Sequence, residues 1–138
     1  MTKQHITITS VIAAPAERIW QYWTDPNHIT HWNFASDDWC CPNAENDVKV
    51  GGRYKTRMEA KDGSIGFDFE AIYDKVSPPS LLVYTISDGR TVTTNFESQA
   101  DSTKVTMTFE AEAENAIDMQ RDGWQAILNN FKLYTESQ

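Results

Sequence analysis

The sequence predicts an α+β protein in which a curved antiparallel sheet of about six strands wraps a long C-terminal helix. Two segments support this prediction, because each places tryptophan among apolar residues at helical spacing: residues 15–26 and residues 123–128. Between them, short segments alternate apolar and polar side chains, which is typical of strands with one face on a core. This combination indicates a binding cavity more clearly than a catalytic site.

Length and composition limit the classes of partner. The 138 residues can bury a core without disulfides or metals, so we expect one domain over residues 1–138. No apolar run approaches the roughly 18–20 residues that span a bilayer, and no signal sequence precedes the first strand, so we expect a cytoplasmic protein. The net charge of −8 repels phosphate backbones and anionic lipids, which argues against nucleic acid and membrane as partners.

The N-terminal region predicts a strand followed by two short helices. Residues 5–12 alternate as a strand does, and Pro15 suits the first position of a helix of about nine residues. One face of this helix carries Ala16, Ile19, Trp20 and Trp23. Asp25 before Pro26 predicts the N-cap of the second helix. The inward residues that follow are Ile29 and Trp32.

Residues 33–49 show little periodicity, and we therefore expect a long loop that carries Phe34 and Trp39. Loops of this length in a compact domain are often lids or binding elements. The segment is accordingly predicted to be a lid over the cavity.

The two cysteines, Cys40 and Cys41, are adjacent and cannot clamp a loop, which favours a reduced compartment. An alternative is a zinc site with His28 and His31, because histidines three residues apart can share one helix face. Structural zinc sites prefer cysteines separated by two to four residues. We therefore expect no metal and no cofactor, with one buried thiol, one exposed thiol and two solvated histidines.

Five further strands complete the predicted sheet, which is an antiparallel meander. Residues 53–60 alternate cleanly, with Tyr54, Thr56, Met58 and Ala60 on the inward face. Asp62-Gly63 predicts a hairpin. The returning strand ends at Ser77 and points inward with Ile65, Phe67, Phe69, Ala71 and Tyr73. The remaining strands are predicted at residues 81–86, 91–97 and 103–110, with Asp88-Gly89 turning between the first two.

Residues 115–135 change to a helical period. The apolar stripe of this helix consists of Ile117, Trp124, Ile127, Leu128, Phe131 and Tyr134. Gly123 lies within the stripe at a cost of about 1 kcal/mol relative to alanine. We therefore expect it to allow close approach to the sheet or to a ligand.

The order of elements and several motifs resemble one known family. These motifs are Pro15-Ala16-Glu17-Arg18-Ile19-Trp20, Trp23-Thr24-Asp25-Pro26, Trp32, Gly51-Gly52-Arg53-Tyr54, Phe67-Asp68-Phe69-Glu70, Leu82-Val83-Tyr84, Thr103-Lys104-Val105-Thr106 and Gly123-Trp124-Gln125-Ala126-Ile127-Leu128. Together they resemble the family named for the C-terminal domain of the activator of the heat-shock-protein-90 ATPase, within the START-like (SRPBCC) helix-grip superfamily. The resemblance implies an apolar cavity between the sheet and the last helix, which the wider superfamily uses for lipids, sterols, plant hormones and polyketides.

No catalytic constellation is visible, and no phosphate-binding loop supports an ATPase activity. We expect a cavity that binds a small apolar or aromatic molecule, with the hydroxyls of Tyr54, Tyr73, Tyr84 and Thr94 orienting it. The same inward residues could instead form an ordinary core. The predicted ligand-binding residues are Trp32, Phe34, Trp39, Tyr54, Met58, Phe67, Phe69, Tyr73, Tyr84, Thr94, Phe96, Met107, Trp124 and Leu128.

Two other functions stay open from the sequence. The first is a co-chaperone module in the stress response that contacts a chaperone through an outer face around Arg53, Lys55, Arg57, Asp68 and Glu70. The second is a metal-independent cyclase or hydratase-like enzyme that uses the cavity. A monomer or a weak homodimer through a sheet edge is expected in each case.

Overall fold

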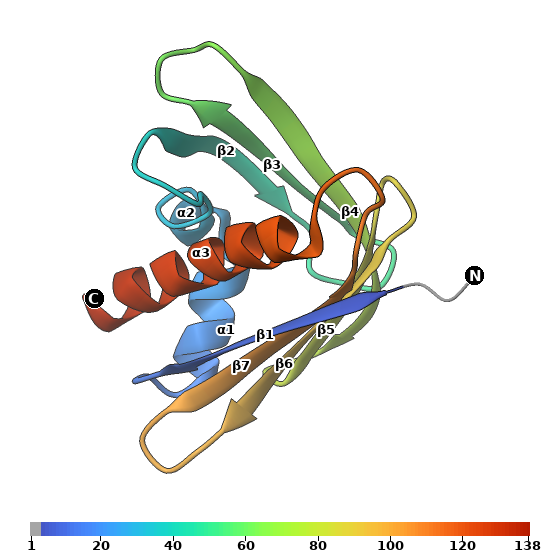
Figure 1. Ribbon diagram of the computed structural model, residues 1–138. Helices are drawn as coiled ribbons and strands as arrows, with labels where there is room; N and C mark the ends of the chain where they lie inside the picture. The colour runs from blue at the N-terminus through green and yellow to red at the C-terminus, as the bar shows by residue number, and fades with distance from the viewer. Residues whose placement is uncertain (1–3) are drawn as a thin grey trace.

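The computed structural model describes residues 4–138 as a strongly curled antiparallel sheet with a long helix across its concave side (Figure 1). Its elements are β1 (His5–Ile12), α1 (Ala16–Thr24), α2 (Pro26–Ile29), β2 (Trp39–Asn46), β3 (Arg53–Ala60), β4 (Gly66–Ser77), β5 (Leu81–Ile86), β6 (Thr91–Ser98), β7 (Thr103–Glu110) and α3 (Ile117–Glu136). The strands lie in the order β1-β7-β6-β5-β4-β3-β2. The predicted α+β fold is confirmed, with seven strands instead of about six.

The two short helices after β1 form as predicted, with one difference at Pro15. This residue is extended and is the N-cap of α1, one position before the helix that it was expected to begin. Asp25 caps α2 through its side chain, whose Oδ1 accepts a hydrogen bond of 2.9 Å from the backbone N–H of Asn27. Ile29 and Trp32 are both buried, so this turn of the chain is fixed to the core.

The segment predicted as a long loop contains a strand, β2, and the expectation of a lid over residues 33–49 is wrong in this respect. β2 pairs with β3 along its length, with an irregular register between Cys40 and Asn43. This irregularity removes the alternation that would have predicted a strand. Because β2 is held by backbone hydrogen bonds to β3, it forms part of the wall of the sheet instead of a mobile cover.

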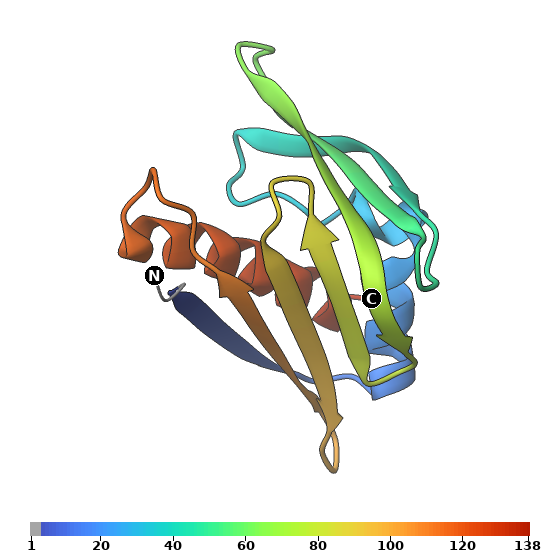
Figure 2. The same ribbon diagram turned by 90° about the vertical axis from the view of Figure 1, so that its right-hand side faces the viewer.

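The hairpin of β3 and β4 extends beyond the rest of the sheet, as Figure 2 shows. Ile65 and Phe67 at its far end are 60% and 46% exposed, whereas Ala71 and Tyr73 nearer the helices are buried. Ile65 precedes β4 and does not face the core, contrary to the prediction. The alternation is correct for the strand, but no helix covers the end of the ribbon.

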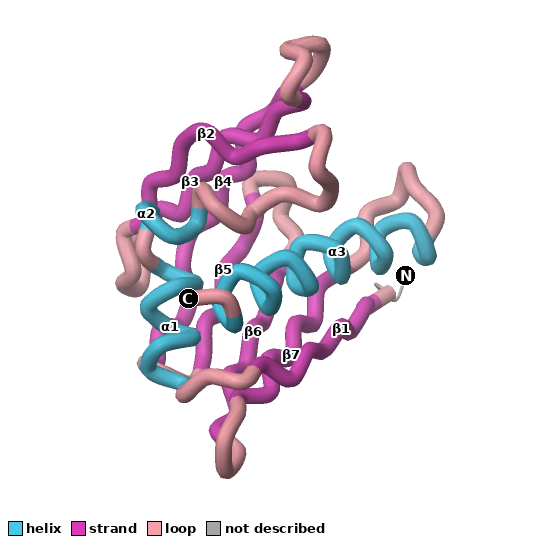
Figure 3. The backbone as a smooth tube through the Cα atoms, turned by 90° about the vertical axis from the view of Figure 1, so that its left-hand side faces the viewer, coloured by secondary structure: helices cyan, strands magenta, loops and turns pink. Residues whose placement is uncertain are grey.

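Helix α3 packs mainly against β1 and covers its free edge (Figure 3). Gln125 Nε2 donates to the Thr9 carbonyl at 3.2 Å, and Lys132 Nζ donates to the Val11 carbonyl at 2.7 Å. Glu136 Oε2 accepts a 2.8 Å hydrogen bond from the Ala13 N–H. These side chains satisfy backbone groups that an edge strand otherwise leaves open to pairing with another chain.

The inner side of α3 meets the two short helices at its C-terminal half. Leu128 and Phe131 are almost completely buried there. The rings of Trp23 and Trp32 stack at 5.0 Å, and Phe131 meets each of them edge-on at 4.8 Å. Within residues 4–138, no helix is both long and apolar enough to cross a membrane.

We expect Gly123→Ala to stabilise the protein by roughly 0.5–1 kcal/mol, because alanine lowers the entropy of the unfolded chain in a helix interior. A Cβ at Gly123 would meet nothing within 4 Å, so the predicted close approach to the sheet does not occur. Urea unfolding monitored by circular dichroism measures the change.

Gly52→Ala is the contrasting variant for the same experiment, because a Cβ there would lie 2.0 Å from the Asp47 carbonyl oxygen. We expect a loss of about 1–3 kcal/mol or more. A destabilised Gly123→Ala protein would show instead that α3 needs a glycine at this position.

Candidate functional site

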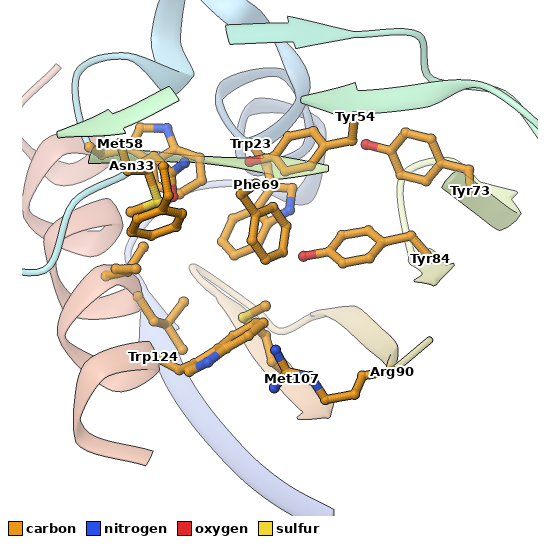
Figure 4. Close-up of a pocket in the computed structure, with 14 residues that line it drawn as sticks. Trp23, Asn33, Tyr54, Met58, Phe69, Tyr73, Tyr84, Arg90, Met107 and Trp124 are labelled. Atoms are coloured by element: carbon orange, nitrogen blue, oxygen red, sulfur yellow. The ribbon is translucent and has the colours of Figure 1, made fainter. Parts of the chain in front are cut away.

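A cavity of about 250 Å³ lies between the concave face of the sheet and α3 (Figure 4). Its lining residues come from α1, the turn after α2, four strands (β3, β4, β5 and β7), the β5–β6 turn and α3. They are Trp23, Trp32, Asn33, Tyr54, Met58, Phe67, Phe69, Tyr73, Tyr84, Arg90, Met107, Trp124, Ile127 and Leu128. Because exposed Phe67 belongs to this set, the cavity reaches the surface at the end of the β3–β4 hairpin.

Aromatic rings on β3, β4 and β5 form one wall of the cavity. Tyr54 and Tyr84 lie nearly parallel with centroids 5.8 Å apart, and Phe69 meets both rings edge-on at 6.0 and 6.2 Å. On the opposite side, Trp124 of α3 stacks on Phe109 of β7 at 4.0 Å. These contacts fix the rings in position, so the space between them is preformed.

The polar groups at the cavity are few and differ in their contacts. The Tyr73 hydroxyl donates to Asn46 Oδ1 at 2.8 Å, so its proton is already used within the protein. The Tyr84 hydroxyl makes no hydrogen bond within the described part of the chain, and Figure 4 shows it directed toward Phe69. Tyr84 can therefore offer a donor or an acceptor to a bound molecule.

Burial dominates the ionisation of the cavity tyrosines. Desolvation raises the pKa of Tyr84 and of Tyr73 far above the ordinary value, with the Asn46 hydrogen bond opposing the shift for Tyr73. Desolvation also raises the pKa of Tyr54, and the neighbouring Tyr84 and Tyr73 add to the effect. All three phenols are therefore neutral at physiological pH.

Ten of the fourteen predicted residues line the cavity and four do not. Trp39 lies on β2 with its ring 6.1 Å from that of Phe67, outside the cavity lining. Phe96 packs edge-on against Trp20 and Trp23 of α1. Thr94 is buried with a hydroxyl that has no hydrogen-bond partner in the described structure, and half-buried Phe34 also lies outside the lining.

Four lining residues were missing from the predicted set: Trp23, Asn33, Arg90 and Ile127. Trp23 and Ile127 were predicted to face inward, so helical spacing could have found them. Asn33 and Arg90 lie in turns, where periodicity carries no information about direction. Arg90 is the only charged side chain in the lining formed by residues 4–138.

The histidines and cysteines do not assemble a metal site. His28 packs parallel to the Tyr22 ring at 4.1 Å, and its Nδ1 lies 2.6 Å from the Tyr134 hydroxyl. Both thiols are free, and burial raises the pKa of Cys41. Within residues 4–138, no three His, Cys, Asp or Glu side chains lie close enough to hold a metal ion. The zinc alternative with His28, His31, Cys40 and Cys41 therefore lacks the required cluster.

The curled sheet around a long C-terminal helix, with a cavity between them, defines a helix-grip protein. The family model described as "Activator of Hsp90 ATPase homolog 1-like protein" matches residues 13–136, and the chain belongs to this family. The resemblance inferred from the motifs is therefore confirmed.

Solved structures of bacterial proteins agree with this assignment. The AHSA1-like protein from Aeromonas hydrophila is 42% identical with a TM-score of 0.92, over 97% of this chain and 93% of its own. A protein from Cytophaga hutchinsonii is 46% identical with a TM-score of 0.83, over 96% and 92%. A protein from Chromobacterium violaceum shares the fold at 21% identity, with a TM-score of 0.86 over 96% of both chains. The comparison with curated proteins gave no match.

We expect Tyr84→Phe to flatten the alkaline loss of stability. The pKa of Tyr84 is raised in the folded state above an unfolded value near 10, so its contribution is fully present below that pH and is lost as the pH rises toward the folded pKa. Above about pH 10, the unfolding free energy of the wild type should fall more steeply than that of the variant, by up to about 1.4 kcal/mol per pH unit.

Urea unfolding between about pH 8 and pH 11 measures this difference. Tyr73→Phe is the matched variant, because it removes the hydrogen bond to Asn46 and should cost about 1 kcal/mol at neutral pH, where Tyr84→Phe costs little. Parallel curves for wild type and Tyr84→Phe at alkaline pH would contradict the burial of the Tyr84 phenol.

Proposed function

We propose that this protein binds a small apolar or aromatic molecule in the cavity between the sheet and α3. The observation that carries the proposal is a space of about 250 Å³ walled by aromatic and aliphatic side chains that are held by one another. Ligand sites in proteins are mostly apolar hollows with a small number of placed polar groups. Tyr84 and Arg90 supply such groups here.

The size of the cavity limits the ligand to a small molecule. Its volume is slightly below the roughly 300–1,000 Å³ typical of pockets for drug-sized compounds. A ligand of two or three aromatic rings, or a short alkyl chain, matches this space better than a sterol or a complete phospholipid. The exposed end at Phe67 offers a route of entry that does not require unfolding of the sheet.

Neither alternative function has a comparable observation in its favour. The charges of the outer face are largely engaged with one another: Arg57 lies 2.9 Å from Glu59 and 3.5 Å from Asp68, and Arg53 lies 3.9 Å from Glu70. For an enzyme, the cavity phenols are poor proton carriers because their pKa values lie far above neutrality. Both alternatives stay predictions from the sequence.

Ile127→Phe should abolish or strongly weaken binding of the fluorescent probe phenylnaphthylamine, because the added ring occupies the cavity from the side of α3. The expected loss is at least about tenfold in affinity. A fluorescence titration measures it, with thermal unfolding as the check that the fold persists.

Leu133→Phe is the matched control, because Leu133 lies on the same helix and is 68% exposed. Its affinity for the probe should equal that of the wild type. Equal binding by all three proteins would place the probe outside the cavity and contradict the proposal. If the variants behave as expected, native mass spectrometry of protein purified from its own host would identify the natural ligand.

A further inference from the structure

Arg90 has an unusual position for the only charged side chain of the cavity lining in residues 4–138. Its side chain is 20% exposed and begins in the β5–β6 turn. Figure 4 shows it directed toward the wall that Met107 and Trp124 form. Arg90 and Trp124 also line a second pocket outside the cavity, together with Glu112 and Gln120. They therefore lie at the boundary between the apolar interior and a polar outer region.

Two contacts hold the guanidinium of Arg90 in this place. Its Nε donates to Asp88 Oδ2 at 2.8 Å, and its Nη1 donates to the Glu110 carbonyl oxygen at 3.3 Å. Nη2 makes no hydrogen bond to the described residues. Because arginine carries five N–H donors, more than half of its capacity is open, and the orientation is already fixed.

Among the described residues, the neighbouring carboxylates form no hydrogen bond to Nη2, and Glu110 Oε1 accepts from the Thr91 N–H at 2.8 Å. Asp88 accepts from Nε through Oδ2, and its other oxygen accepts from the Arg90 backbone N–H at 3.1 Å instead of from Nη2. The Glu112 carboxylate accepts a hydrogen bond from Asn115 in the outer pocket. Nη2 is therefore open to an anionic group, which would form a charge-assisted hydrogen bond there in place of water.

We propose that the cavity selects molecules that combine an apolar or aromatic body with one anionic group, such as a carboxylate or sulfonate, and that Arg90 binds this group. The inference rests on the proposed function and names its ligand class. A planar guanidinium binds such oxyanions through paired, charge-assisted hydrogen bonds. A neutral ligand lacks the charge for this pairing, and a cationic ligand is repelled by the guanidinium. The apolar body lies against the aromatic wall, with the Tyr84 hydroxyl available to a second polar atom.

A purely structural role for Arg90 is the alternative, because the same two contacts fasten the β5–β6 turn to the end of β7. Two probes that share one aromatic scaffold distinguish this structural role from anion binding. Anilinonaphthalene sulfonate carries an anionic group, and phenylnaphthylamine does not. Their affinities are measured by fluorescence titration for wild type, Arg90→Met and Arg90→Lys, with circular dichroism to verify the fold.

We expect Arg90→Met to lower the affinity for the sulfonate by roughly 10- to 100-fold, because a hydrogen bond to a charged group is lost. The affinity for the neutral probe should change by less than about twofold. Arg90→Lys should give an intermediate sulfonate affinity, because lysine keeps the charge but loses the paired geometry. A structural role alone would weaken both probes together.

Other outcomes distinguish this inference from the proposed function. If Ile127→Phe blocks both probes but Arg90→Met leaves the ratio of their affinities unchanged, the cavity binds ligands and the anion selectivity is wrong. If neither probe binds wild-type protein, or if Ile127→Phe changes neither affinity, both proposals fail. Should Arg90→Met not fold, an unchanged affinity ratio in Arg90→Lys overturns the selectivity.

Discussion

The packing of Trp23, Trp32 and Phe131 is the contact on which the arrangement of the helices depends. It joins α1, the turn after α2 and the C-terminal half of α3 in one aromatic cluster. Lys132 and Gln125 then bind α3 along the edge of β1. With one end fixed in the cluster and one side fixed to β1, the helix cannot settle over β3, β4 and β5. The uncovered part of the concave face becomes the cavity.

The cavity persists because its rings support one another instead of collapsing inward. Phe69 contacts Tyr54 and Tyr84 edge-on within its own wall and also meets Trp124 of α3 edge-on, so each of these rings is held by neighbouring rings. An empty apolar space costs stability, since its walls lose contacts that a filled core would make. A bound molecule would restore those contacts, which is why a preformed space of this kind agrees with ligand binding as the proposed function.

Elements with local signals could be predicted from the sequence, and the composition of the cavity only in part. Strand β7 could be predicted because its side chains alternate between buried and partly exposed positions. The helix cap at Asp25 depends on a single side chain. Both signals lie within a few consecutive residues. β2 could not be predicted because the irregular register at Cys40 hides its period. Alternation predicts that Phe96 and Tyr84 both lie on the inner face of the sheet. It does not predict that Phe96 packs beneath α1 whereas Tyr84 faces the cavity, because this difference depends on where the helices lie.

The acidic surface and Arg90 are expected to affect different rate constants of ligand binding. A net charge of −8 repels anions at a distance, but salt screens this field over about 8 Å at physiological ionic strength. The attraction of Arg90 acts inside the cavity, where less water screens it. An anion without an apolar body meets only the repulsion, whereas one with such a body gains burial first and the guanidinium contact afterwards. Arg90 would therefore act mainly on the dissociation rate, and the acidic surface on the association rate.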